Sequence, residues 1–311
     1  MEFSAFLDEL KKEQISFIGS LNQDNKSFSI TWLDSLKLQI KIENYGKSYF
    51  FKCNADENDF ADYGEAIASA IASFVGINAI KSYLAQNCNG YGVIMNDFTK
   101  EENEYVSLST ILSSFNEASM RTYDKVIAAV KFFCEDNDII CDKTVERDLK
   151  RLILLDYLLL QQDRHGENIE FEISTNEKGD SVLKVVPIYD NEFCFLFMFD
   201  DRVWDNYKYN EQTFISQIFA FSKEDPVNAL ANEVIKSEDL TNILERYLKV
   251  DIEKLIDFCD EASGKTMPIK YRKVVKEIFE NQKKKLCSEI KVLSIKKVIK
   301  AGEEDENTII L

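Results

Sequence analysis

The stretch that decides the fold is LLLQQDRHGENIEF, residues 158–171. It contains His165, the only histidine among 311 residues, and around it lie Asp163, Arg164 and Asn168. A long apolar run precedes this group, and a segment typical of a β-strand follows it. This order predicts a buried helix, then a polar loop, then a strand. Side chains in such a loop can reach a cleft.

The composition is that of a globular protein, with 45% hydrophobic and 30% charged residues. The net charge of −17 would repel nucleic acid, so we expect no direct nucleic-acid partner. Seven cysteines without a C-x-x-C pair indicate free thiols in a reducing compartment, and a single histidine makes a zinc site improbable. The N-terminus lacks the order of a signal peptide. The longest apolar run, LILLDYLLL, is too short to span a bilayer, so we expect a cytoplasmic protein.

The first third of the chain reads as a β-rich unit. Its middle strand alternates clearly, with Leu36, Leu38, Ile40 and Ile42 on one face. We expect strands at 28–33, 36–44, 48–54, 80–86 and 91–98, and helices at 3–15 and 62–77. The acidic TKEENE (99–104) is a polar break and predicts a hinge, which divides the chain into an N-lobe (1–98) and a C-lobe (99–311).

After the break the chain is mainly helical. A hairpin directly follows the DRHGEN motif, with strands at 168–173 and 182–190. We expect the C-terminal GEEDEN (302–307) to be a frayed tail. Helices are expected near 107–115, 120–135, 144–162, 211–222, 226–236, 238–248, 251–262 and 268–291. The fold class is therefore α+β, with a small β-rich lobe that carries one helix and a larger helical lobe.

The hairpin brings polar groups together. Asp163 precedes its first strand, Asn168 opens that strand, and Asp190 ends the returning strand. Carboxylate and amide oxygens of this kind suit Mg²⁺. Phosphoryl transfer also needs a strand lysine that neutralises phosphates and a helix glutamate that pairs with it. Lys52 and Glu65 are the candidates for these two roles.

These motifs resemble a known family. The pair D-R-H-x-x-N and PIYD (187–190) resembles the HipA-like branch of the protein-kinase superfamily. The chain is more similar still to the small stand-alone members of that branch, the CtkA-like bacterial serine/threonine kinases. The resemblance covers about residues 45–290, and further matches follow in the same order: YFFK (49–52), GEAIASAIASFVGI (64–77), GVIMNDF (92–98) and MPIKYRKVVKEIFENQKKKL (267–286).

The resemblance implies a bilobal kinase fold and specific roles for the residues. Asp163 would be the catalytic base, and Asn168 and Asp190 would bind Mg²⁺. Lys52 would contact the phosphates of ATP while Glu65 holds it. Backbone groups around the hinge would hold adenine, with Met95, Asp97 and Phe98 as the expected residues.

The resemblance also implies a class of substrate and partners. The substrate would be a serine or threonine hydroxyl of a protein, including this chain itself. The protein would act as a bacterial toxin or effector, in the cytoplasm or delivered to a host or target cytosol. An antitoxin partner is compatible with the family, but nothing in the sequence supports one.

Several alternatives stay open. No G-x-G-x-x-G phosphate loop is present, which favours a pseudokinase that acts as an interaction module. Phosphoinositide kinases also carry D-R-H-x-x-N, so a kinase of lipids or small molecules is a further alternative. A metal-dependent phosphohydrolase would usually need more than one histidine.

The two basic residues of the motif are expected to support the loop. We predict that His165 hydrogen-bonds within the loop and supports Asp190, and that it takes no direct part in catalysis. For Arg164, an ion pair with a neighbouring acid and a surface position are both open.

Overall fold

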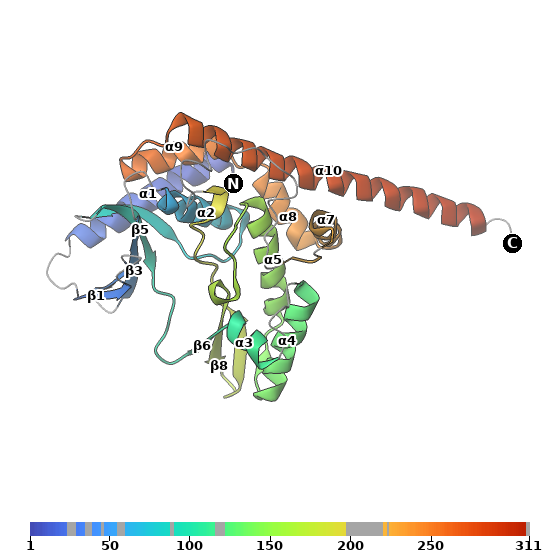
Figure 1. The fold of residues 1–311 in the computed structure, drawn as a ribbon, viewed down its shortest axis with the longest axis horizontal. Helices are drawn as coiled ribbons and strands as arrows, with labels where there is room; N and C mark the ends of the chain where they lie inside the picture. The colour runs from blue at the N-terminus through green and yellow to red at the C-terminus, as the bar shows by residue number, and fades with distance from the viewer. Residues whose placement is uncertain are drawn as a thin grey trace.

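The computed structural model describes nine segments of the chain: 1–23, 29–34, 39–44, 47–54, 60–87, 90–115, 122–196, 220–222 and 224–308. It confirms the α+β class, with a small sheet toward the N-terminus and a mostly helical remainder (Figure 1).

The first sheet is antiparallel and has five strands in the order β1-β2-β3-β5-β4. Strands are present at all five predicted places, although Leu36 and Leu38 of the alternating segment lie outside the described residues. One face of the sheet is buried, where Tyr49 and Phe51 of β3 cluster with Tyr83 and Ile94. The strands are β1 (Ser29–Asp34), β2 (Gln39–Asn44), β3 (Lys47–Cys53), β4 (Ser82–Asn87) and β5 (Gly90–Asn96). Strand β4 ends the sheet on one side.

Helix α2 (Ala61–Val75) lies between the sheet and the helical part of the molecule. Every residue of α2 except Ser73 is buried, because β4 and β5 cover one side and two later helices, α8 (Glu238–Tyr247) and α9 (Ile252–Ser263), cover the other. Gly76 ends α2 with a φ of +86°, a conformation that glycine adopts without steric cost.

The first helix, α1 (Phe3–Gln23), is longer than the 3–15 predicted from its spacing. Phe3 and Phe6 pack on Phe74 of α2, and Phe17 stacks on Tyr83 of β4 at 4.3 Å between ring centroids. The helix therefore covers one face of the edge strand.

A second, four-stranded sheet contains the predicted hairpin. Its order is β6-β8-β9-β7, where β8 (Glu170–Thr175) and β9 (Ser181–Val185) are the hairpin and β6 (Glu104–Ser107) and β7 (Ile140–Cys141) flank it. Neither flanking strand was expected from the sequence. They have four and two residues, which is too short for a periodic pattern.

The remaining helices follow the predictions closely. They are α3 (Leu108–Ser114), α4 (Tyr123–Asp136), α5 (Thr144–Leu158), α7 (Pro226–Lys236), α8, α9 and α10 (Ile269–Thr308), with 3₁₀ turns η1 (Gly166–Asn168) and η2 (Cys194–Leu196). The helix expected at 211–222 falls largely outside the described residues, and its described part, 220–222, is not helical. The frayed tail expected at 302–307 is wrong, because α10 continues to Thr308.

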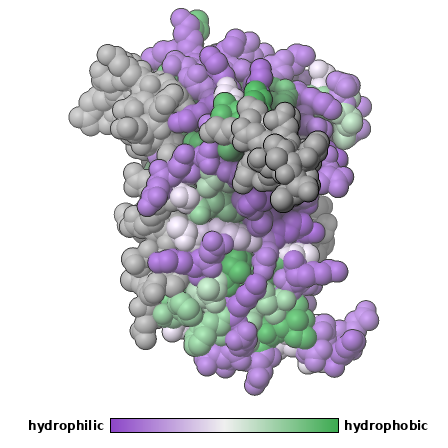
Figure 2. All heavy atoms as spheres, turned by 90° about the vertical axis from the view of Figure 1, so that its right-hand side faces the viewer, coloured by the Kyte–Doolittle hydropathy of each residue, from purple (hydrophilic) through white to green (hydrophobic). Residues whose placement is uncertain are grey.

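The helical elements are arranged around α5. Helices α1, α2 and α9 lie together above the first sheet, α5 runs beside them, and α10 crosses the molecule before its C-terminal half projects outward (Figure 1). The face on that side is largely hydrophilic, with separate hydrophobic areas (Figure 2). Within the described part of the chain, no helix combines the length and apolarity needed to cross a membrane.

Candidate active site

A lysine whose side chain is only 11% exposed marks the centre of the site. The Nζ atom of Lys52 on β3 lies 3.5 Å from Oε1 of Glu65 on α2 and 2.7 Å from Oδ1 of Asp190, which follows β9. It also forms an ion pair with Glu192. Helix α2 and the segment 190–192 thus place three carboxylates around the ammonium group of β3. Glu192 was not among the residues predicted from the sequence, although it lies two positions after Asp190.

The close approach of α2 to this segment depends on Gly64. A Cβ atom at that position would lie 2.8 Å from the backbone oxygen of Glu192 and 3.0 Å from that of Asn191. Only a residue without a side chain permits this contact. Glu65 comes next in the helix, so the same contact brings its carboxylate to Lys52.

The electrostatics of the cluster follow from its burial. Burial lowers the pKa of Lys52, but Glu65, Asp190 and Glu192 raise it by more, and the net pKa lies above the ordinary value. The lysine is therefore cationic at neutral pH. Complete burial raises the pKa of Glu65, and Lys52 offsets only part of that increase.

The three carboxylates also form a set that fits a metal ion. One oxygen from each of Glu65, Asp190 and Glu192 lies within 4.8 Å of the others. Oε1 of Glu65 is buried and accepts no hydrogen bond within the described structure. Oxygen donors of this kind match the preference of Mg²⁺.

Gln161 joins the two halves of the loop. Its Oε1 accepts a hydrogen bond from the backbone N–H of Asp163 (3.0 Å), and its Nε2 donates to the backbone oxygen of Asp190 (3.1 Å). The side chain is fully buried. Asp190 has a φ of +59°, which is uncommon for a residue other than glycine. The sequence analysis missed Gln161, because nothing in its neighbourhood distinguishes it from Gln162.

Arg164 is the second brace, and of the two alternatives left open by the sequence the structure shows the ion pair. Its fully buried guanidinium pairs with Asp156 on α5, with Nε 3.1 Å from Oδ2. Its Nη1 donates to the backbone oxygens of Asn168 (3.3 Å) and Tyr189 (2.6 Å). One side chain therefore ties the start of the hairpin to its end, which a surface arginine could not do.

A polar chain continues from Arg164 to the lysine. Nη2 of Arg164 donates to Oδ1 of Asn191 (2.6 Å), and Nδ2 of Asn191 donates to Oε2 of Glu65 (3.4 Å). The catalytic-loop candidates and the Lys52–Glu65 pair are thus connected through Asn191. Buried polar networks whose members are hydrogen-bonded hold a single arrangement.

The loop itself presents Asp163 to solvent. Its side chain is 42% exposed, and Nε2 of His165 lies 3.7 Å from its Oδ2. His165 Nδ1 accepts a hydrogen bond from Glu167 N–H, so the predicted bond within the loop exists. The predicted support of Asp190 by His165 is wrong: Gln161 and Arg164 hold the backbone there. Nδ2 of Asn168 donates to the backbone oxygen of Asp163 (3.0 Å).

The expected adenine-binding segment follows β5. The N–H of Asp97 donates to the backbone oxygen of Ser48 (2.9 Å), and Met95 is paired with Phe50 in the same ladder. Because alternate residues of a strand turn to opposite sides, the backbone groups of Asn96, between them, point away from β3. The ring of Phe98 packs on Tyr189, the neighbour of Asp190, at 5.6 Å between centroids.

Comparison with solved structures finds a protein of similar architecture. No family model matches the sequence, and no curated protein matches it. The solved structure of the Helicobacter pylori proinflammatory kinase CtkA is 18% identical over 85% of this chain and 95% of CtkA, with a TM-score of 0.58. HipA of Shewanella oneidensis MR-1, solved with HipB and its operator DNA, is 13% identical over 86% of this chain and 65% of HipA, with a TM-score of 0.44.

At these identities the similarity establishes the fold alone. The small sheet, the helical part and the order of the elements are those of a kinase-like structure. The chain therefore has a kinase-like fold similar to that of CtkA, which confirms, at the level of the fold, the resemblance to CtkA-like kinases seen in the sequence.

Proposed function

We propose that the protein is an ATP- and Mg²⁺-dependent phosphotransferase that acts on serine or threonine hydroxyls of proteins. The proposal rests on the position of Lys52, which is held by Glu65 and Asp190 next to a loop that presents Asp163. A cation for phosphates, the side chains of Asn168 and Asp190 for a metal, and an accessible base are the parts that phosphoryl transfer needs.

Asp163 is suited to the role of base because its carboxylate is partly exposed while its backbone is held by Gln161. In the proposed reaction the hydroxyl oxygen of the substrate attacks the γ-phosphorus of ATP. The bond from that phosphorus to the β,γ-bridging oxygen breaks, ADP leaves, and the hydroxyl proton passes to Asp163. Positioning of the attacking hydroxyl accounts for much of the rate enhancement in reactions of this class.

The other residues would hold the nucleotide. Asn168 and Asp190 would bind Mg²⁺, which neutralises charge on the phosphate oxygens. The ammonium group of Lys52 would move from Asp190 to the phosphates and would keep its ion pair with Glu65. Adenine would lie against the segment from Met95 to Phe98, where Asn96 directs its backbone groups away from β3.

The test is intact-mass spectrometry of the purified chain after incubation with Mg²⁺-ATP. The wild type is expected to gain the mass of one or more phosphate groups, and Asp163→Asn, which keeps the shape of the side chain, is expected to gain none. Asp136→Asn, an exposed residue at the end of α4, serves as the matched control and should behave as the wild type.

Calorimetric titration with Mg²⁺-ATP completes the test. Asp163→Asn should bind with wild-type affinity, while Asp190→Asn should bind more weakly. Failure of the wild type to bind would exclude an ATP-dependent transferase. Binding without any mass gain, in the presence or absence of a generic protein substrate such as casein, would favour the pseudokinase.

A further inference from the structure

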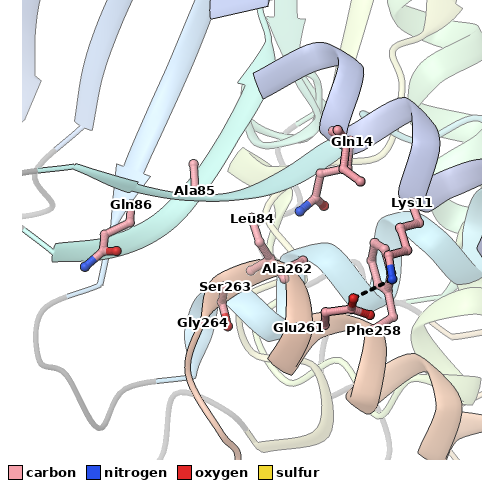
Figure 3. Close-up of a pocket in the computed structure, with 11 residues that line it drawn as sticks. Lys11, Gln14, Leu84, Ala85, Gln86, Phe258, Glu261, Ala262, Ser263 and Gly264 are labelled. Atoms are coloured by element: carbon pink, nitrogen blue, oxygen red, sulfur yellow. Dashed lines mark hydrogen bonds and ion pairs between the residues drawn. The ribbon is translucent and has the colours of Figure 1, made fainter. Parts of the chain in front are cut away.

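A second pocket lies away from the candidate active site, between α1, the edge strand β4 and the end of α9 (Figure 3). Its volume is about 500 Å³, which is within the range of pockets that take small molecules. Leu84, Phe258 and Ala262 form apolar walls. None of the residues assigned above to phosphoryl transfer lines it.

The side chain of Gln14 points into this pocket. Gln14 of α1 is only 7% exposed, and its side chain extends toward the space above Ala262 (Figure 3). No residue that the structure describes forms a hydrogen bond with this amide, and its two polar atoms are not among the fully buried unpaired atoms, so they are accessible from the pocket. The amide is therefore open to the pocket, where water or a ligand can supply its partner.

The edge of the sheet adds backbone groups to the same pocket. The N–H of Ser82 donates to Oγ of Ser69 and not to β5, so Ser82 faces the free edge. Because alternate residues face the same side, Leu84 and Gln86, which line the pocket, also direct their N–H and C=O groups outward.

The charged residues of the lining neutralise each other. Nζ of Lys11 and Oε1 of Glu261 form an ion pair of 2.5 Å at the solvent-facing side of the pocket, where their side chains are 44% and 63% exposed. Among the described residues, the lining thus combines apolar walls, a donor and acceptor in Gln14, and no net charge.

From this combination we propose that the pocket binds a small uncharged molecule with an apolar body and an amide or lactam edge. The edge would exchange two hydrogen bonds with Gln14, since an amide pairs with another amide as both donor and acceptor. The body would lie between Leu84 and Phe258. Charged ligands are disfavoured because they would lose hydration without gaining a counter-charge.

Occupation of the pocket would be transmitted to α2. Ser263 lines the pocket, and its Oγ lies 2.9 Å from the hydroxyl of Tyr63, which also donates to Asp260 (2.9 Å). Lys265 forms a buried ion pair with Asp62 (3.0 Å). These contacts hold the first turn of the helix that carries Glu65. A regulatory effect on catalysis rests on the proposed function, whereas the binding site does not.

Binding is tested with isoquinolin-1(2H)-one, a flat lactam, by calorimetric titration of the full chain. Saturable binding is expected for the wild type, with at least tenfold weaker binding for Gln14→Leu. The exposed neighbour variant Lys12→Gln should keep wild-type affinity. 1-Methoxyisoquinoline, which lacks the lactam N–H, should bind at least tenfold more weakly than the lactam. Ala262→Met, which fills the pocket and keeps Gln14, should abolish binding.

Transmission is read by hydrogen exchange. The amides of residues 62–65 should exchange several-fold more slowly when the lactam is present, in the wild type but not in Gln14→Leu. No saturable binding at millimolar lactam, or equal binding to Gln14→Leu, would overturn the site. Unchanged exchange despite binding would overturn the link to α2. An absence of phosphate transfer leaves both readouts intact, so the failure of the proposed function is seen separately.

Discussion

At the scale of single residues, adjacent side chains of the same type have different roles in the site. Gln161 and Gln162 are adjacent and identical in chemistry. Only Gln161 makes hydrogen bonds to both Asp163 and Asp190, whereas Nε2 of Gln162 is buried without a partner in the described structure. Substitutions of Gln161 and of Gln162 can therefore be compared to measure the effect of the two hydrogen bonds that Gln161 makes in the loop.

Replacing Gln161 with leucine tests whether its two hydrogen bonds stabilise the loop and position Asp163 and Asp190. Two partly buried backbone groups would lose their partners, which should lower the free energy of unfolding by about 2 kcal/mol. Misplacement of Asp163 and Asp190 should slow phosphate incorporation by at least about tenfold. Gln162→Leu removes no hydrogen bond and should leave both quantities near wild type. Equal effects of the two substitutions in urea unfolding and rate assays would contradict the role of Gln161.

Lys52→Met tests the charge balance of the cluster. Without the ammonium group, Glu65 and its neighbours are left as buried uncompensated carboxylates, and the expected loss at pH 7 is about 3 kcal/mol. The loss should shrink at pH 5. Burial raises the pKa of Glu65, and removing Lys52 removes the main influence that lowers it. A carboxyl group with a raised folded-state pKa favours the fold at low pH, and this contribution disappears as the pH rises through that pKa.

Urea unfolding of Lys52→Met at both pH values measures this difference. Lys284→Met, an exposed position on α10, is the control and should cost little at either pH. A loss that is the same at pH 5 and pH 7 would show that packing, and not charge, explains the effect of the substitution.

At the scale of elements, the decisive contact is that of α2 with the backbone at Asn191 and Glu192. Gly64 permits it, although glycine within a helix is unfavourable relative to alanine by about 1 kcal/mol. Glycine at this position therefore lowers the intrinsic stability of the helix, but it allows α2 to approach the backbone of Asn191 and Glu192. Because Glu65 follows directly, the position of α2 determines whether the Lys52–Glu65 pair can form.

Gly64→Ala should accordingly be destabilising despite its better helix propensity. The new methyl group would meet backbone atoms at 2.8 Å, and overpacking of this kind costs about 1–3 kcal/mol. Displacement of α2 should also slow phosphate incorporation. Ser73→Ala, at the exposed position of the same helix, should be neutral or slightly stabilising. If Gly64→Ala raises the unfolding free energy as Ser73→Ala does, the close approach is not a constraint.

At the scale of the whole molecule, the two sheets belong to different parts of the chain but share a core. One cluster of buried residues extends from Phe3 through α2 to Leu286 on α10. The parts also meet through a parallel bridge between Ala79 and Ile188. The division into lobes between residues 98 and 99 stays a prediction. The buried core contains residues from both sides of this boundary.

A shared core predicts cooperative unfolding. Scanning calorimetry should show a single transition in which the calorimetric and van't Hoff enthalpies agree. Ile71→Ala, at a fully buried position of α2, should lower the midpoint of the whole transition, because its cavity costs about 2–5 kcal/mol. Two resolved transitions, of which only one responds to Ile71→Ala, would indicate two independently folding lobes.

The sequence by itself determined the local features. The elements of the first sheet, α2, the hairpin and most later helices could be predicted because apolar periodicity and turn residues act within a few positions. The DRHGEN motif and PIYD identified Asp163, Asn168 and Asp190 as candidates because they are contiguous patterns. Short strands such as β6 and β7 escaped, since their position depends on pairing with the hairpin.

Only the tertiary structure decided which groups meet. Lys52 and Asp190 are 138 positions apart, so no local pattern shows that they share a hydrogen bond, or that Glu192 joins them. The burial of Arg164 and the bridge made by Gln161 likewise depend on the packing of α5 against the hairpin. The pocket at Gln14 exists because α1 and α9 flank the free edge of β4. Such contacts join residues that are far apart in the chain, and local sequence patterns do not show which of these residues meet.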